Sequence, residues 1–137
     1  MGTASLPHPR GACHPKPERE YDRYYSDTLL AAKAGIDIKA LYDVVRVSGG
    51  NSRVFEGVVP SVCKRDFAVS FEIRLAHKDM VYVSSLGREM NMPLPMVNSL
   101  LNVLDLAKAT GLGRENTNAL VKLWEKASNV EVRHAWE

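Results

Sequence analysis

Apolar residues recur at intervals of three and four from about Glu18 onward in this 137-residue chain, and glycine or proline separates one such stretch from the next. Intervals of three and four place side chains on one face of an α-helix. Only Val130 and Val132 alternate in the manner of a β-strand, and little else in the chain could pair with them. The sequence therefore predicts an all-α domain with six or seven helices.

Short helices with clear start and stop signals are predicted in the first half of the chain. The first helix has one apolar face, made up of Tyr21, Tyr25, Leu29 and Ala32. It ends at Gly35, since glycine readily adopts the left-handed conformation that stops helices. Asp37 caps the second helix, whose predicted buried residues are Leu41, Val44 and Val45. Asn51 or Ser52 caps the third, and Pro60 is expected to open a separate fourth turn.

Longer helices are predicted in the second half. Residues 67–70 form an extended link, after which Ser70 is expected to cap a helix over residues 71 to about 90. The next helix covers residues 95 to about 110 and is apolar nearly all round, which predicts that it is central and buried. Gly111 and Gly113 end it. Asn116 or Thr117 then caps a last helix, whose inward face is formed by Leu120, Val121, Leu123 and Trp124.

Residues 1–18 differ in composition from the rest, because they hold four of the seven prolines: Pro7, Pro9, Pro15 and Pro17. Proline lacks the amide proton and clashes with the preceding helical turn, so this stretch is not helical. The predicted organisation is a flexible proline-rich tail over residues 1–18 and one helical domain over residues 19–137.

Composition excludes several classes of function. The net charge is only +2, and basic residues are interleaved with acidic ones, so no basic stripe for nucleic acid is present. No apolar run approaches the roughly 20 residues that span a bilayer, so no membrane contact is expected. No metal site is expected either, because the sequence has no Cys-x-x-Cys or His-x-x-x-His pair. Cys13 and Cys63 do not form a disulfide framework, which favours reduced thiols in the cytoplasm.

Lys78 is the most informative candidate for a binding residue. It falls within a stripe at helical spacing, made up of Phe71, Leu75, Lys78 and Tyr82. A lysine in such a stripe either extends its ammonium to solvent or directs it at an anionic or polar ligand. His77 and Asp79 flank it, but adjacent helical residues diverge by about 100°, so the three do not converge on one atom.

A second candidate is the small-residue loop of Ser48, Gly49, Gly50, Asn51 and Ser52. Such a loop at a helix start either presents backbone amides to a carboxylate or is simply a turn. The chain has no Gly-x-Gly-x-x-Gly dinucleotide motif, and Gly111 and Gly113 follow a helix instead of a strand. No Gly-x-Ser-x-Gly nucleophile motif is present.

Six segments of the sequence resemble one known family in their order and spacing. They are AKAGID at 32–37, VSGGNSR at 47–53, KRDFAVSF at 64–71, LAHKDM at 75–80, MPLP at 92–95 and GLG at 111–113. Together they resemble the C-terminal domain of the β-hydroxyacid dehydrogenases, the family of 3-hydroxyisobutyrate dehydrogenase and tartronate semialdehyde reductase. The resemblance covers about residues 27–128. It implies the all-α fold of the C-terminal domain of 6-phosphogluconate-dehydrogenase-like proteins.

The resemblance also implies roles for individual residues. In that family a Rossmann domain binds NAD or NADP, and the helical domain closes over the nicotinamide and the substrate. The resemblance makes Lys78 the cofactor contact and Phe71 the residue that lines the nicotinamide side. The Ser48–Ser52 loop corresponds to the family loop that faces the substrate cleft.

One departure from the family decides the function expected of this chain. The family's catalytic lysine lies on a long helix upstream of the AKAGID segment, where this chain has its proline-rich tail, and Lys16 between two prolines cannot lie inside a helix. No catalytic residue is therefore assigned. The chain is expected to be the substrate- and cofactor-side domain of a dehydrogenase, inactive and without a bound cofactor when alone, and to need a Rossmann-domain partner.

The alternative is a free-standing module for self-association or protein interaction. A helical domain without its long first helix exposes apolar surface, and association with a second copy is the usual way to cover it. The predicted seam is the segment 21–30, and a homo-oligomer is expected.

Overall fold

The computed structural model describes the backbone of residues 18–134 and the side chains of residues 24–134. In this part the chain forms α1 (Glu18–Lys33), α2 (Ile38–Arg46), α3 (Arg53–Cys63), α4 (Ile73–Glu89), α5 (Pro95–Ala109), two 3-10 helices η1 (Leu112–Arg114) and η2 (Thr117–Leu120), and α6 (Val121–Ser128). The all-α prediction is confirmed. The proposed tail of residues 1–18, with Cys13, lies outside the described residues, except that α1 already begins at Glu18.

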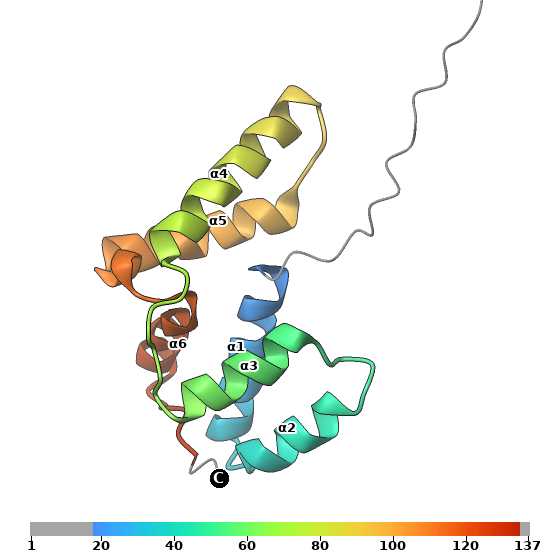
Figure 1. Cartoon of the computed structure of the whole chain (residues 1–137), viewed down its shortest axis with the longest axis vertical. Helices are drawn as coiled ribbons and strands as arrows, with labels where there is room; N and C mark the ends of the chain where they lie inside the picture. Colours follow the sequence, from blue (N-terminus) through green and yellow to red (C-terminus); the bar gives the residue numbers. More distant parts are fainter. Residues whose placement is uncertain (1–17, 135–137) are drawn as a thin grey trace, which may run out of the picture.

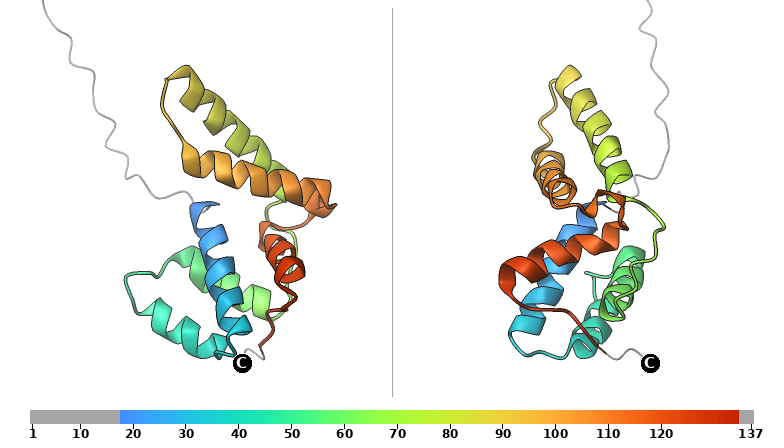
Figure 2. Two further views of the ribbon diagram at one scale, coloured as in Figure 1. Left: turned by 180° about the vertical axis from the view of Figure 1, so that it is seen from behind. Right: turned by 90° about the vertical axis from the view of Figure 1, so that its left-hand side faces the viewer.

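The helices form a bundle from which one hairpin stands out (Figure 1). Helices α1, α2, α3 and α6 pack together, and α4 and α5 form an antiparallel hairpin that reaches away from them. The views from behind and from the side show the same separation, with the start of α1 approaching α5 (Figure 2). The largest fully buried side chains come from both parts and are Tyr25, Phe55, Ile73, Leu104, Val121 and Val132.

The start and stop signals near α2 act as predicted. Gly35 has a φ of +72°, and the Asp37 side chain accepts a hydrogen bond of 2.9 Å from the Lys39 amide. The predicted buried face is wrong at Val44, which is exposed. The reason is geometric: Leu41 and Val45 share a face with the buried Ile38, whereas Val44 points about 100° away from Val45.

Helix α3 is one continuous helix, so the separate turn predicted at Pro60 is wrong. A proline inside a helix leaves the carbonyl four residues earlier without its amide donor. Here that carbonyl belongs to Glu56, and it accepts a hydrogen bond of 3.4 Å from the Tyr42 hydroxyl of α2. Buried residues on both sides of Pro60, such as Val58 and Val62, keep the helix in one piece.

Ser52 caps α3 and is expected to contribute strongly to stability for a side chain of its size. Its hydroxyl accepts a hydrogen bond of 3.0 Å from the Phe55 amide and lies 2.7 Å from the Tyr24 hydroxyl of α1. Replacing Ser52 by alanine is expected to lower the free energy of unfolding by about 1–2 kcal/mol. Urea denaturation measures this. The control is Ser99→Ala, which removes only a bond to the Pro95 carbonyl within α5; equal effects would contradict the interpretation.

The start of α4 differs from the prediction. The helix begins at Ile73, and Ser70 does not cap it. Instead, the segment before α4 pairs antiparallel with the segment before η2: the Ile73 amide donates to the Glu115 carbonyl at 3.0 Å, and the Thr117 amide donates to the Phe71 carbonyl at 2.9 Å. These bonds hold the backbone around Phe71 outside the helix, and the helical stripe therefore starts two residues later than predicted.

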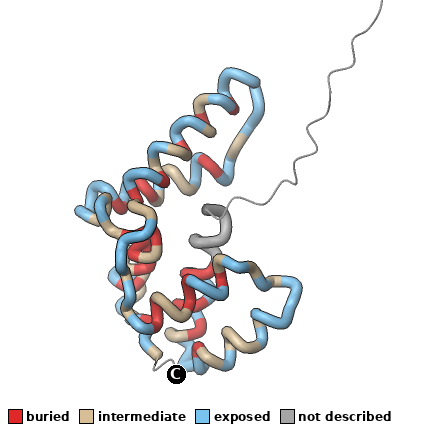
Figure 3. The backbone as a smooth tube through the Cα atoms, viewed as in Figure 1, coloured by how far each residue is buried: buried red, intermediate tan, exposed pale blue. Residues whose placement is uncertain are grey.

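Helix α5 is not buried all round, so that prediction is wrong. Val97, Leu104 and Ala107 are buried, but the side chains of Met96 and Leu106 are 58% and 54% exposed. The cause is the position of the helix in the hairpin, where α4 covers one side and much of the other side is open (Figure 3). The helix is apolar on faces that the described chain does not cover.

The described end of the chain packs against the bundle without forming a strand. The Val132 side chain is fully buried, and its amide donates to the Glu125 carboxylate at 2.9 Å. The same carboxylate accepts a hydrogen bond of 2.6 Å from Arg65. This ion pair gives the nearly buried Glu125 its charge partner and fixes the end of the chain beside α6.

Candidate functional site

Lys78 lies in the middle of α4 on a face that no other described element covers. Its side chain is 57% exposed, and its ammonium nitrogen is 3.8 Å from a carboxylate oxygen of Asp79. That distance is longer than a hydrogen bond. The ammonium is therefore available to a ligand or to another protein domain.

Apolar side chains flank Lys78 along the same face. Leu75 and Tyr82, one turn before and after it, are both exposed, and Tyr82 is 67% exposed. The spacing continues to Leu86, which is exposed as well and was not among the residues predicted from the sequence, although it follows Tyr82 by four positions. The face formed by Leu75, Lys78, Tyr82 and Leu86 is called the α4 face below.

Phe71 does not belong to the α4 face. It lies two residues before the helix begins, and its half-buried side chain packs against the core. The structure therefore places Phe71 at the foot of α4, about two helical turns along the chain from Lys78. Helical spacing alone put the two residues on one face, and the antiparallel pairing with Thr117 changes that arrangement.

His77 points to a different side of α4 from Lys78. Its Nε2 atom is 2.7 Å from a carboxylate oxygen of Asp105, and its Nδ1 atom is 3.2 Å from the Lys108 ammonium. Both partners lie on α5, so the histidine connects the two helices of the hairpin. His77, Lys78 and Asp79 do not converge on one point.

Local hydrogen bonds engage the side chains of the small-residue loop, which consists of Ser48, Gly49, Gly50, Asn51 and Ser52. Ser48 donates from its hydroxyl to the Val45 carbonyl at 2.8 Å and accepts from the Gly50 amide at 3.1 Å. Asn51 donates to the Glu56 carboxylate at 2.8 Å, and Ser52 is the cap of α3. The loop joins α2 and α3 within the bundle, away from the α4 face (Figure 1). The structure does not bring this loop and Lys78 together.

Cys63 is buried at the end of α3, and burial raises the pKa of its thiol from an ordinary value of 9.0 to about 11. Folding therefore holds the thiol protonated, whereas the unfolded chain ionises near pH 9. The resulting stabilisation is complete below pH 9 and is lost as the pH rises to about 11. A rise of this size corresponds to at most about 2–3 kcal/mol.

Across that pH window the wild type is expected to lose stability relative to Cys63→Ala. Chemical denaturation of both chains below, within and above the window measures the difference. A difference that stays constant with pH would contradict the role given to burial. The same burial and raised pKa exclude Cys63 as a nucleophile at neutral pH.

Within residues 24–134, no three histidine, cysteine, aspartate or glutamate side chains come together as metal ligands would. None of the described helices combines the length and the apolar character needed to cross a membrane.

Comparison with known proteins gives consistent matches over most of the chain. Residues 27–124 match the family described as the NAD-binding domain of NADP-dependent 3-hydroxyisobutyrate dehydrogenase. The chain is 32% identical over 105 residues to 2-(hydroxymethyl)glutarate dehydrogenase of Eubacterium barkeri, covering 76% of this chain and 35% of that protein. It is 33% identical over 95 residues to L-threonate dehydrogenase of Escherichia coli K12, covering 69% of this chain and 32% of that protein.

A solved structure supports the same fold. The crystal structure of 3-hydroxyisobutyrate dehydrogenase from Salmonella typhimurium superposes with a TM-score of 0.72 at 29% identity, covering 78% of this chain and 38% of that chain. The chain thus spans about a third of the length of the relatives that it matches.

Proposed function

This chain belongs to the NAD-binding domain family of the 3-hydroxyisobutyrate dehydrogenases, and on that basis we propose that it is the helical, substrate- and cofactor-side domain of a β-hydroxyacid dehydrogenase. The complete enzymes of the family use NAD or NADP. In the proposal, this domain corresponds to the C-terminal domain of such an enzyme, and its α4 face closes over the nicotinamide end of the cofactor.

The exposed ammonium of Lys78 on the α4 face is the observation that carries the proposal. Its 3.8 Å separation from Asp79 leaves its hydrogen-bond donors free, and a nicotinamide dinucleotide has phosphate, ribose and carboxamide oxygens that accept such bonds. Leu75 and Tyr82 on either side offer apolar surface to an aromatic ring. These residues therefore fit the polar and apolar parts of the cofactor.

The residues of this chain would bind and shield; they would not react. Lys78 holds the polar part of the cofactor, and Leu75 and Tyr82 exclude water around it. Phe71 is not part of this face, because its half-buried side chain packs against the core at the foot of α4. A nicotinamide cofactor, when bound, supplies the hydride chemistry. The loop at 48–52 is left out, because its side chains are used within the loop and in the cap of α3.

The proposed activity needs a nucleotide-binding domain as a partner, because these 137 residues contain no Gly-x-Gly-x-x-Gly motif and no assigned proton donor. The isolated chain is therefore expected to bind NAD and NADP weakly or not at all and to show no turnover. We also propose the cytoplasm as its location, because Cys63 is a free thiol of the kind that a reducing compartment preserves.

Isothermal titration with NAD and NADP, together with an assay on small β-hydroxyacids, tests this proposal. The expected result is a folded chain without turnover. Turnover by the isolated chain would contradict the assignment of these residues to binding alone.

A second candidate function is self-association, and exposed apolar residues of the hairpin favour it. In the described part of the predicted seam at 21–30, Tyr24, Tyr25 and Leu29 are buried, whereas Leu30 is 70% exposed. Further exposed apolar side chains lie on α4, in the turn that follows it and at the start of α5: Tyr82, Leu86, Met90, Met92 and Met96. Light scattering is expected to show a dimer that Leu86→Lys converts to a monomer. A strict monomer at high concentration would exclude this function.

A further inference from the structure

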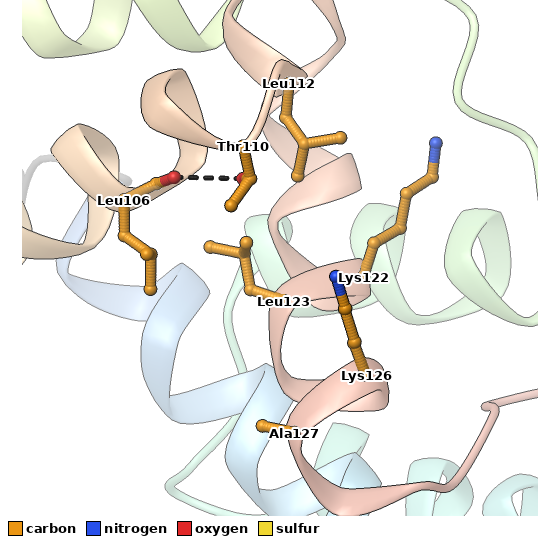
Figure 4. A pocket seen from close by; sticks show the side chains of 7 residues that line it. All are labelled: Leu106, Thr110, Leu112, Lys122, Leu123, Lys126 and Ala127. Carbon is orange, nitrogen blue, oxygen red and sulfur yellow. Dashed lines mark hydrogen bonds between the residues drawn. The ribbon is translucent and has the colours of Figure 1, made fainter.

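A hollow of about 490 Å³ lies between the end of α5, η1 and α6, in a part of the molecule that the proposed function does not use. Its lining residues are Leu106, Thr110, Leu112, Lys122, Leu123, Lys126 and Ala127 (Figure 4). A volume of this size falls within the roughly 300–1,000 Å³ of small-molecule sites.

The inner surface of the hollow is apolar. Leu106, Leu112 and Leu123 come from three different elements, and their side chains point into one shared space (Figure 4). Thr110 adds little polarity, because its hydroxyl donates to the Leu106 carbonyl at 2.9 Å and is thereby used within α5. The surface therefore suits an alkyl chain and offers no hydrogen-bond donor from its floor.

The rim carries two lysines one helical turn apart on α6, and only one of them lacks a charge partner. The Lys122 ammonium pairs with Glu115 and lies 4.5 Å from the centre of the Phe67 ring. Within the described residues, the structure gives Lys126 no ion pair. A neighbouring hollow of about 450 Å³ shares both lysines, but the cation on its other side, Arg65, is bound to Glu125 at 2.6 Å.

We propose that this hollow binds a small monocarboxylate with a short alkyl chain, with the chain against Leu106, Leu112 and Leu123 and the carboxylate at Lys126. One uncompensated cation matches one negative charge, so a polyanion is not the expected ligand. A neutral apolar molecule would fill the floor but leave the ammonium at the rim without a partner. The site is separate from the α4 face and does not depend on the proposed dehydrogenase function.

Octanoate is the probe that tests the site. Titration of the ¹⁵N-labelled full chain, followed by the shifts of backbone amides, is expected to give saturable changes at Leu112, Leu123 and Ala127. The expected dissociation constant is on the order of 1 mM, as for a ligand of about ten heavy atoms with one charged contact. Octanol, which has the same chain without the charge, is expected to bind at least threefold more weakly.

Two variants separate the charge from the apolar floor. Lys126→Gln keeps most of the side-chain stem and is expected to weaken octanoate binding about two- to fivefold, the effect typical of a solvent-exposed ion pair. Lys64→Gln, at an exposed lysine outside the hollow, is the matched control and should have no effect. Ala127→Leu fills the hollow and should abolish octanoate binding. Leucine is well tolerated in helices, so we expect this variant to fold, and an unchanged melting temperature would show that it does.

Three outcomes would overturn the proposal. The first is the absence of shifts at tenfold the expected dissociation constant. The second is equal binding of octanol and octanoate, which would remove the carboxylate from the site. The third is a set of shifts centred on the α4–α5 hairpin, which would show that octanoate only coats exposed apolar surface.

Discussion

Lys78→Gln is expected to raise the KM for the nicotinamide cofactor about 10- to 100-fold, since hydrogen bonds to charged groups contribute roughly 1.5–3 kcal/mol. The measurement needs a complete enzyme. A chimera supplies it, in which residues 27–124 replace the matching region of L-threonate dehydrogenase from Escherichia coli. Glutamine keeps most of the stem and a polar end, so the change mainly removes the positive charge on the exposed α4 face.

The Lys78→Gln substitution should weaken cofactor binding without slowing the chemical step. The turnover number at saturating cofactor is therefore expected to change little, because Lys78 is assigned no part in proton transfer. Lys64→Gln in the same chimera is the matched control, as Lys64 is an exposed lysine at the end of α3. If the Lys78→Gln and Lys64→Gln variants both have the KM of the unmodified chimera, Lys78 is excluded as a cofactor contact.

Gly87→Ala and Gly57→Ala are expected to change stability in opposite directions, although the substitution is the same and both residues lie inside helices. A Cβ atom at Gly87 would clash with the Leu94 side chain and would lie 3.2 Å from the backbone carbonyl oxygen of Met92. A Cβ atom at Gly57 would meet nothing within 4 Å. Gly87→Ala should therefore lower the free energy of unfolding by about 1–3 kcal/mol, whereas Gly57→Ala should raise it by up to about 1 kcal/mol.

Urea denaturation of the two variants gives both values against one wild type. The comparison tests the packing of the α4–α5 hairpin, because Leu94 reaches Gly87 only if the end of the hairpin closes as the structure shows. Stabilisation of both variants by the same amount would mean that Leu94 does not pack against Gly87. The α4 face would then have no fixed support at its far end.

The features that the sequence predicted correctly depend on near neighbours in the chain. The stop at Gly35 and the caps at Asp37 and Ser52 each involve residues within a few positions of one another. The prediction failed at Pro60, because the donor that replaces its missing amide is the Tyr42 hydroxyl of another helix. Local sequence does not reveal a partner at that separation.

The exposure of α5 was mispredicted for a related reason. A helix that is apolar all round is buried only if other elements surround it, and the spacing of Met96 and Leu106 does not show how many neighbours the helix has. In this chain α4 covers one side, and the exposed apolar residues remain available to the rest of an enzyme or to a second copy.

The candidate site was predicted in part. Spacing placed Leu75, Lys78 and Tyr82 on one face of a helix, and the structure confirms that arrangement. It also included Phe71, which the antiparallel pairing with Thr117 holds outside the helix. The hollow beside Lys126 could not be predicted, because it depends on how α5, η1 and α6 meet.

Acetylation of lysines in the chimera, with and without bound cofactor, tests the central claim most directly, because it reports which ammonium the cofactor covers. Mass spectrometry of the modified peptides compares Lys78 with Lys64, an exposed lysine that is also part of the chimera. If the α4 face binds the cofactor, saturating NADH should slow acetylation of Lys78 at least severalfold and leave acetylation of Lys64 unchanged. Equal acetylation of Lys78 with and without NADH, in a chimera that turns over, would contradict the account.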